Sequence, residues 1–170
     1  MISILFCFLM FNEEIPSGSL IFIEGGNVIV QEFTNSSITH VGIIIKENND
    51  YYVYEAIRPK VRKVLLNDYL KSIKDERIWI AKLKSNYHVD YEKMKSYLDS
   101  QLNKKYAIKN YKKEKVDNKT IFCSQLVVEC YNNSCSKKIF LSEAQNYAPI
   151  DVWNVIKNYS YIERYDNEKR

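Results

Sequence analysis

Residues 121–131 read IFCSQLVVECY and place a cysteine, Cys123, at the start of an apolar repeat with helical spacing. The first backbone N–H groups of a helix have no partner within the helix, and they point toward a side chain at its N-terminus. Such a position favours the thiolate form of a cysteine. The stretch therefore predicts a helix that carries a cysteine nucleophile in its first turn.

Two segments far upstream offer partners for this cysteine. His40, one of only two histidines, opens the β-branched run at 40–45, and Glu55 lies in the next such run, at 51–56. A cysteine nucleophile needs a base within hydrogen-bond reach and a third group that fixes the imidazole tautomer. His40 suits the base better than His88, which lies in a polar connection.

Glu55 has mainly apolar neighbours in the sequence. An unpaired carboxylate is costly to bury, so we expect Glu55 to contact a partner such as His40. The alternative is a surface glutamate at the edge of a strand. A Cys/His/Glu triad is the leading hypothesis.

Hydrophobic spacing predicts the remaining elements. Short strands are expected at 19–23, 40–45, 51–56, 61–65 and 77–83. Helices are expected at 28–33, at 91–102, from Cys123 onward, and at 151–158 after Pro149. Polar turn residues at 46–50 and a proline corner at 58–60 favour antiparallel pairing of the strands they join. No repeat or linker interrupts the chain, which predicts one α+β domain with a small antiparallel sheet packed on helices.

The composition is that of an ordinary globular protein, since 46% of the 170 residues are hydrophobic and 27% are charged. The net charge of +4 comes from a lysine surplus in residues 104–119. This loop either associates weakly with an anionic substrate or membrane surface, or is a solvated connection. Basic residues confined to one loop argue against nucleic-acid binding.

The four cysteines, at positions 7, 123, 130 and 135, form no C-x-x-C pair and have no histidine at zinc-ligand spacing. We therefore expect no metal site. Cys130 would share a helix face with Cys123 at a distance too great for a disulfide, so we expect it to be a small buried side chain. Cys135 is either free or paired.

The first eleven residues are apolar, too few for a helix that spans a bilayer, which needs about 20 residues. They resemble the centre of a signal peptide, although no basic residue precedes them and no small-x-small cleavage site follows. The alternative is an N-terminal segment packed on the domain. We expect residues 1–14 to be a signal peptide or apolar N-terminal segment of an exported protein, and 15–170 to form a single domain.

Four motifs follow one another along the chain: SGSLIF at 17–22, THVGI at 39–43, VYEA at 53–56 and FCSQLV at 122–127. In this order they resemble the YiiX-like family of circularly permuted papain-like hydrolases, which belongs to the NlpC superfamily and includes an orthopoxvirus branch. The similarity covers about residues 15–131. In addition, YAPID at 147–151 resembles the proline-containing C-terminal segment of that family.

The resemblance implies a permuted papain-like (NlpC-type) core, in which the sheet with the histidine precedes the helix with the cysteine. It implies Cys123 as nucleophile, His40 as base and Glu55 as the carboxylate that orients His40. Tyr106 stands where the family has a tyrosine that lines the site, and Ser124 is the second implied substrate contact. The chain departs from the family pattern around Tyr106, where the family's glycine, proline and aspartate are missing.

As function, the resemblance implies a monomeric thiol peptidase or amidase that needs no cofactor and cleaves a peptide or acyl-amide substrate, of cell-wall type, through a thioacyl intermediate. Two alternatives are a lipid-directed acyltransferase or thioesterase of the same fold, and a binding module without turnover. A polar cleft would favour a peptide and a long apolar channel a lipid. A buried Cys123 without a cleft would favour the binding module.

Overall fold

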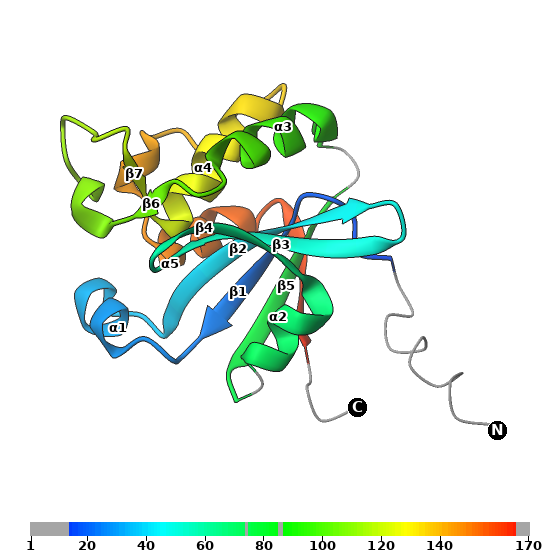
Figure 1. Ribbon diagram of the computed structural model, residues 1–170, viewed down its shortest axis with the longest axis horizontal. Helices are drawn as coiled ribbons and strands as arrows, with labels where there is room; N and C mark the ends of the chain where they lie inside the picture. Colours follow the sequence, from blue (N-terminus) through cyan, green and yellow to red (C-terminus); the bar gives the residue numbers. More distant parts are fainter. Residues whose placement is uncertain (1–13, 74, 85–86, 166–170) are drawn as a thin grey trace.

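The computed structural model describes residues 14–73, 75–84 and 87–165 (Figure 1). Their strands form one eight-stranded sheet in the order β7-β6-β4-β3-β2-β1-β5-β8. The strands are β1 (Ser19–Glu24), β2 (Ile38–Glu47), β3 (Asp50–Ile57), β4 (Lys60–Leu65), β5 (Arg77–Leu83), β6 (Lys105–Tyr106), β7 (Thr120–Ile121) and β8 (Ser160–Tyr165). The helices are α1 (Val28–Thr34), α2 (Leu66–Ser72), α3 (Tyr91–Gln101), α4 (Cys123–Ser134) and α5 (Pro149–Ile156), with short 3₁₀ helices η1 (Ile108–Asn110) and η2 (Ala144–Asn146).

The centre of the sheet is apolar on both faces. In β1, Leu20 and Phe22 join the core on one face, while Ile21 and Ile23 join the core on the other. Successive side chains of a strand point to opposite faces, so a strand without polar alternation has to be covered on both sides. β1 accordingly lies between β2 and β5 and pairs antiparallel with both.

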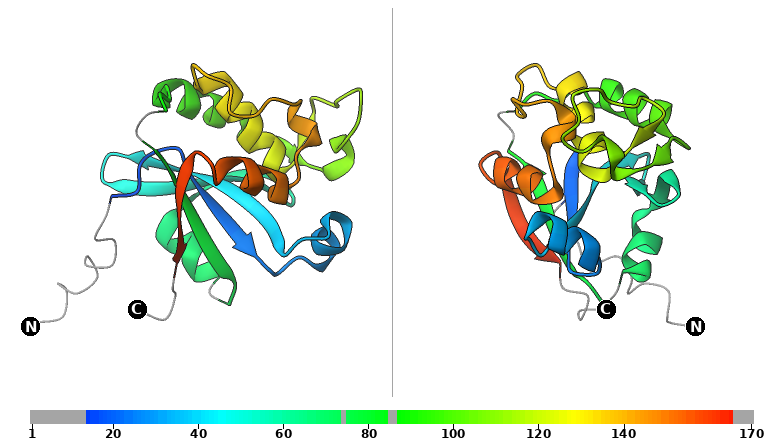
Figure 2. Two further views of the ribbon diagram at one scale, coloured as in Figure 1. Left: turned by 180° about the vertical axis from the view of Figure 1, so that it is seen from behind. Right: turned by 90° about the vertical axis from the view of Figure 1, so that its left-hand side faces the viewer.

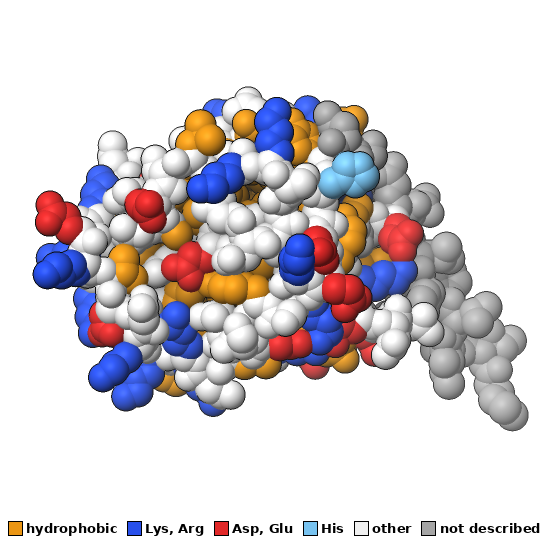
Figure 3. Space-filling model, turned by 90° about the horizontal axis from the view of Figure 1, so that it is seen from above, with side chains coloured by type: hydrophobic (Ala, Val, Ile, Leu, Met, Phe, Trp, Pro, Cys, Tyr) orange, Lys and Arg blue, Asp and Glu red, His pale blue; other side chains and the backbone are white. Residues whose placement is uncertain are grey.

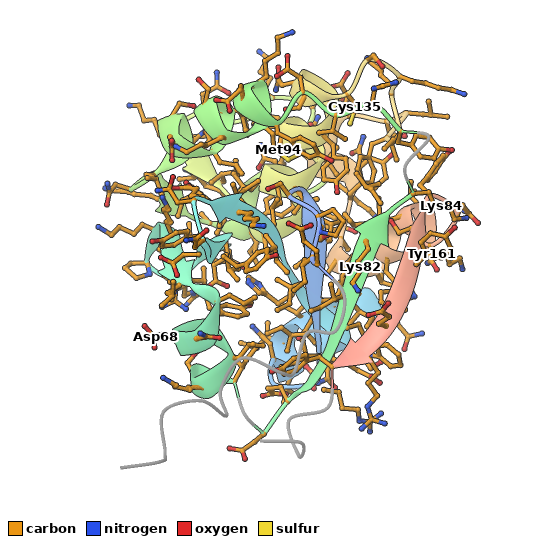
Figure 4. The ribbon with its side chains drawn as sticks, turned by 90° about the vertical axis from the view of Figure 1, so that its right-hand side faces the viewer. Asp68, Lys82, Lys84, Met94, Cys135 and Tyr161 are labelled. Carbon is orange, nitrogen blue, oxygen red and sulfur yellow. The ribbon has the colours of Figure 1, made fainter. Side chains whose placement is uncertain are left out.

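Helices supply the cover on each face (Figures 1 and 2). Helices α3, α4 and α5 bury one face, and Met94 of α3 points from its helix toward the sheet (Figure 4). Helix α2 covers the other face with Leu70 and Tyr69. Helix α1 buries none of its residues and lies beyond the end of the sheet.

The predicted elements are present in the structure. The predicted pairing across both turns is confirmed, because β2 pairs antiparallel with β3, and β3 with β4. Helix α4 begins at Cys123, and α5 begins at Pro149, two residues before the predicted start. The expected α+β fold is therefore confirmed.

The sheet is larger than the sequence predicts. Helix α2 follows β4 directly, and its N-cap Leu65 makes no side-chain capping bond, so the usual signal of a helix start is missing. Strands β6 and β7 have two residues each and pair in parallel. They are too short to show a periodic hydrophobic pattern in the sequence. Strand β8 adds an edge next to β5, where Tyr161 lies beside Lys82 and Lys84 (Figure 4).

Residues 1–13, which hold most of the predicted N-terminal segment and Cys7, lie outside the described part of the chain. Within the described residues, no helix is both long enough and apolar enough to cross a membrane.

Candidate active site

Helix α4 carries Cys123 as its first residue, so the unpaired backbone N–H groups of its first turn lie at the same end of the helix as this thiol. The next side chain fixes this turn, because the Ser124 hydroxyl donates to the Tyr147 carbonyl oxygen over 2.6 Å. Cys123 is only 5% exposed, yet it lines a groove that opens to solvent. The thiol is thus held in a fixed place at the wall of an accessible cavity.

His40 and Glu55 meet beside this thiol, although 83 positions separate His40 from Cys123 in the numbering. The Nε2 atom of His40 lies 2.5 Å from Oε2 of the buried Glu55. The His40 ring also lies close enough to the Cys123 sulfur for the two groups to interact electrostatically. Because Glu55 occupies Nε2, Nδ1 is the ring nitrogen left for the sulfur.

The charges of the three groups support one another. Burial alone would lower the pKa of His40, but the Cys123 thiolate and the Glu55 carboxylate raise it to about 10. Burial alone would raise the pKa of Glu55, but hydrogen bonds and charge from His40 and Arg62 keep it below its ordinary range. The result favours a His40 imidazolium paired with the Glu55 carboxylate beside the Cys123 sulfur.

Arg62 completes the arrangement and was not foreseen from the sequence. Its Nε lies 2.7 Å and its Nη2 2.6 Å from Oε1 of Glu55, the oxygen that His40 does not use. Arg62 and Glu55 face each other across the β3–β4 pair. Residues directly opposite in an antiparallel pair interact, but no local signal in the sequence shows which residue stands opposite Arg62.

Two tyrosines lie close enough to the site for its charged groups to affect their pKa values. Burial, followed by the charge of Cys123, raises the pKa of Tyr106, which lines the groove as expected for a substrate contact. Burial, followed by the charge of Glu55, raises the pKa of Tyr69 of α2. The Tyr69 hydroxyl has no hydrogen-bond partner of good geometry among the described residues, so its link to Glu55 is one of charge.

The expected substrate contacts Tyr106 and Ser124 both border the groove. The Ser124 hydroxyl, however, is already used to hold the Tyr147 carbonyl oxygen. Its contact with a substrate remains a prediction, and its visible role is to anchor the first turn of α4.

The groove next to Cys123 has a cavity volume of about 70 Å³. Its walls come from α1, from the segment around η1, from the start of α4 and from the start of α5. None of the described lining residues is charged, and aliphatic and aromatic side chains predominate. The cavity is therefore an apolar groove with the Cys123 thiol at its wall.

Burial raises the pKa values of the other two described cysteines. Cys130 is buried, and burial raises its pKa far above the ordinary value. Cys135 is half-buried, and burial raises its pKa to about 11. All three are free thiols, and the prediction that Cys130 is a small buried side chain is confirmed.

Within residues 14–73, 75–84 and 87–165, no three His, Cys, Asp or Glu side chains gather in a way that could hold a metal ion.

Comparison with known proteins places the chain in a family. The permuted papain-like amidase enzymes of the YaeF/YiiX, C92 family match residues 14–161. Among solved structures, the crystal structure of metalloprotein YiiX from Escherichia coli O157:H7 matches with a TM-score of 0.60 and 19% identity, over 75% of this chain and 70% of that chain. None of the curated proteins matches the chain.

Proposed function

Because the chain belongs to the permuted papain-like amidases of the YaeF/YiiX, C92 family and is thus a thiol hydrolase, we propose that it hydrolyses an amide bond with Cys123 as nucleophile, His40 as general acid and base, and Glu55 as the residue that orients His40. The observation that supports these roles most directly is the position of His40. One ring nitrogen bonds to a buried carboxylate, and the ring interacts with a thiol at a helix N-terminus.

In the first half of the reaction, the Cys123 thiolate attacks the amide carbonyl carbon and forms a C–S bond. The developing oxyanion accepts a hydrogen bond from the backbone N–H of Cys123, which has no partner within its helix. The tetrahedral intermediate collapses, the C–N bond breaks, and the proton of the His40 imidazolium passes to the leaving amine.

In the second half, His40 takes a proton from water, and the hydroxide attacks the thioester carbonyl carbon. The C–S bond breaks, the carboxylic acid leaves, and the thiolate and imidazolium are restored. One amide and one water give one acid and one amine. The residues of the site complete this cycle themselves.

The binding module is disfavoured by the same geometry, because Cys123 borders an open groove and interacts with His40. Within the amidases, a cell-wall-type peptide finds little complementarity in a groove whose described lining carries no charge. The association of residues 104–119 with an anionic surface stays a proposal. On the face seen from above, acidic and basic side chains are interspersed and form no field of one sign (Figure 3).

A test compares cysteine variants in an amide hydrolysis assay. We expect Cys123→Ser to abolish release of the amine from simple acyl amides. Cys135→Ser is the matched control, because Cys135 lies outside the groove lining, and we expect it to retain activity. An acyl adduct on Cys123, detected by mass spectrometry after a rapid quench, would identify the thioacyl intermediate. Equal activity in Cys123→Ser and the parent would refute the proposal.

A further inference from the structure

Two lysines face each other where β4 meets β6. Lys60 of β4 and Lys105 of β6 are directly opposite in the antiparallel pair, so their side chains lie on the same face of the sheet. Arg62 follows Lys60 by two positions and shares this face, but its Nε and Nη2 atoms are bonded to Glu55. Arg58 lies in the connection between β3 and β4. We call Arg58, Lys60 and Lys105 the cationic cluster.

The two lysines of the cluster have no carboxylate to balance them. Like charges directly opposite each other in a pair of strands destabilise that pair. Within the described residues, neither lysine forms an ion pair, and the Lys60 ammonium donates to the uncharged amide oxygen of Asn103. Departures from the rules of stable sheets are expected at functional sites. A bound anion would compensate both charges.

Arg58 brings the cluster next to Cys123. The carbonyl oxygen of Pro59, the following residue, accepts a hydrogen bond from the Tyr106 N–H over 2.9 Å, and Tyr106 lines the groove together with Cys123. The charge of Arg58 reaches the Tyr106 hydroxyl, where it partly offsets the effects of burial and of Cys123 on the pKa. Arg58 is exposed and has no hydrogen-bond or ion-pair partner in the described part of the chain. Its guanidinium is therefore free to bind a ligand beside the thiol.

The cluster lies on the side of the site from which the amine leaves. His40, Glu55 and Arg62 come from the neighbouring strands β2, β3 and β4 and contact one another in this order. Strand β6 is the next in the sheet, so the row of side chains continues into Lys105 (Figure 1). In the proposed reaction His40 protonates the leaving amine, so a group attached to this amine points toward the cluster. The groove on the α1 side of Cys123 has no charged residue in its described lining and offers an anion no competing site.

We propose that the amine released by the reaction carries a phosphate group, which the cationic cluster binds. A phosphate monoester has a charge of about −1.5 to −2 at neutral pH and three acceptor oxygens, so it suits several cations better than one carboxylate does. This inference rests on the proposed function, because it assigns the leaving group of the same reaction. Water and the amide give a carboxylic acid and the phosphate-bearing amine, and no bond to phosphorus breaks.

Amides of one acid with three amines test this directly. The substrates are the N-acetyl derivatives of O-phosphoethanolamine, ethanolamine and β-alanine, and the amine released is measured. We expect kcat/KM to be at least about tenfold higher for the phosphate than for the neutral ethanolamine amide, as for one or two charged hydrogen bonds, with the carboxylate between them. Equal values for the phosphate and the neutral amide would overturn the inference. So would a carboxylate preferred to the phosphate, or an equal gain from a phosphate on the acyl side, measured with phosphoglycolyl ethanolamide.

Paired lysine variants locate the phosphate. We expect Lys105→Gln to lower the ratio of kcat/KM between the phosphate and the neutral amide several-fold. Lys138→Gln is the matched control, because it removes the same charge from an exposed lysine beyond the C-terminal end of α4, whereas Cys123 begins that helix. We expect its ratio to equal that of the parent. Equal ratios in all three proteins would overturn the inference, and the ratio removes any effect of a reduced folded fraction.

A binding measurement separates this inference from the proposed function. In Cys123→Ser protein, we expect calorimetry to show binding of O-phosphoethanolamine that Lys105→Gln weakens and Lys138→Gln leaves unchanged, and no binding of ethanolamine. Such binding without hydrolysis of any amide would refute the proposed function and retain the cationic site. Hydrolysis of the neutral and the phosphate amide at equal rates, with no binding of O-phosphoethanolamine, would refute this inference alone.

Discussion

Glu55 connects His40 to Arg62 at the surface of the protein. It is fully buried, and each of its carboxylate oxygens has a separate cationic partner, His40 on Oε2 and Arg62 on Oε1. A buried carboxylate is tolerable only with such partners. Arg62, which is 46% exposed, therefore contributes to the orientation of His40 without contacting it.

A double-mutant cycle measures this positioning role. We expect Arg62→Gln to lower kcat by roughly tenfold, the equivalent of about 1.5 kcal/mol for one hydrogen bond to a charged group, with little change in KM. In a Glu55→Gln background, the same Arg62 substitution should have almost no further effect, because its partner charge is gone. Additive effects of the two substitutions would show that Arg62 acts on the reaction by another route.

The pH profile reports on His40. Its pKa is raised to about 10 from an ordinary value of about 6.5, so the imidazolium that serves as general acid in the proposed reaction persists through neutral pH and is lost only near pH 10. We expect kcat to fall on the alkaline side near this value. Glu55→Gln removes one of the charges that raise the pKa, so its alkaline limb should lie at lower pH. An unchanged limb would mean that another group titrates there.

At the scale of single residues, the sequence alone was enough to identify Cys123, His40 and Glu55 as candidate site residues. Each has a local signal: a cysteine before an apolar helix, a histidine at the entrance of a strand, and a lone carboxylate among apolar residues. The structure brings the three together, and their catalytic roles remain a proposal. Arg62 had no local signal, because its partner was defined only once the register of β3 and β4 was known.

Among the elements, the start of α5 matters most for the shape of the groove. Ala148 and Pro149 border the cavity, and the Asp151 carboxylate accepts a hydrogen bond from the Ala148 N–H over 2.8 Å. This bond is an N-terminal cap that holds the chain as it enters the helix. The Asp151 side chain therefore helps to hold the groove wall in place.

Removal of this cap should weaken the protein measurably. We expect Asp151→Ala to lower the free energy of unfolding by about 0.5–2 kcal/mol in urea denaturation. Asp151→Asn is the control, since its amide oxygen can accept the same hydrogen bond, and we expect a smaller loss. Equal losses in both variants would mean that the negative charge near the helix N-terminus, and not the hydrogen bond, provides the stabilisation.

Long elements with a clear period could be predicted, and short or uncapped ones could not. The strands from β1 to β5 and helices α3 and α4 follow their hydrophobic patterns. Helix α2 lacks a side-chain cap at its start, and β6 and β7 depend on pairing between segments 15 residues apart, Lys105 with Thr120. Tertiary contacts create these elements, so no local sequence pattern predicts them.

On the scale of the whole molecule, two hydrophobic cores share one sheet. Leu98 of α3 belongs to the core on one face, and Leu70 of α2 to the core on the other. Every central strand contributes to both, so neither core is expected to survive the loss of the other.

Paired substitutions test this cooperativity. We expect Leu98→Ala and Leu70→Ala each to lower the free energy of unfolding by about 2–5 kcal/mol. Trp79 and Trp153 contact each other beside the first core, yet their fluorescence should follow a single transition, coincident with circular dichroism, in both variants. A tryptophan transition that Leu70→Ala leaves unchanged would show that the two faces unfold separately.

The central claim is that His40 activates Cys123, and the rate at which iodoacetamide labels Cys123 at about pH 6 tests it most directly. An ordinary cysteine is almost wholly protonated there, so Cys130 and Cys135, whose pKa values are raised by burial, serve as internal controls in the same mass spectrum. We expect Cys123 to be labelled far faster than both, and His40→Ala to slow it by about tenfold or more. Slow labelling of Cys123 that does not change in His40→Ala would contradict the account.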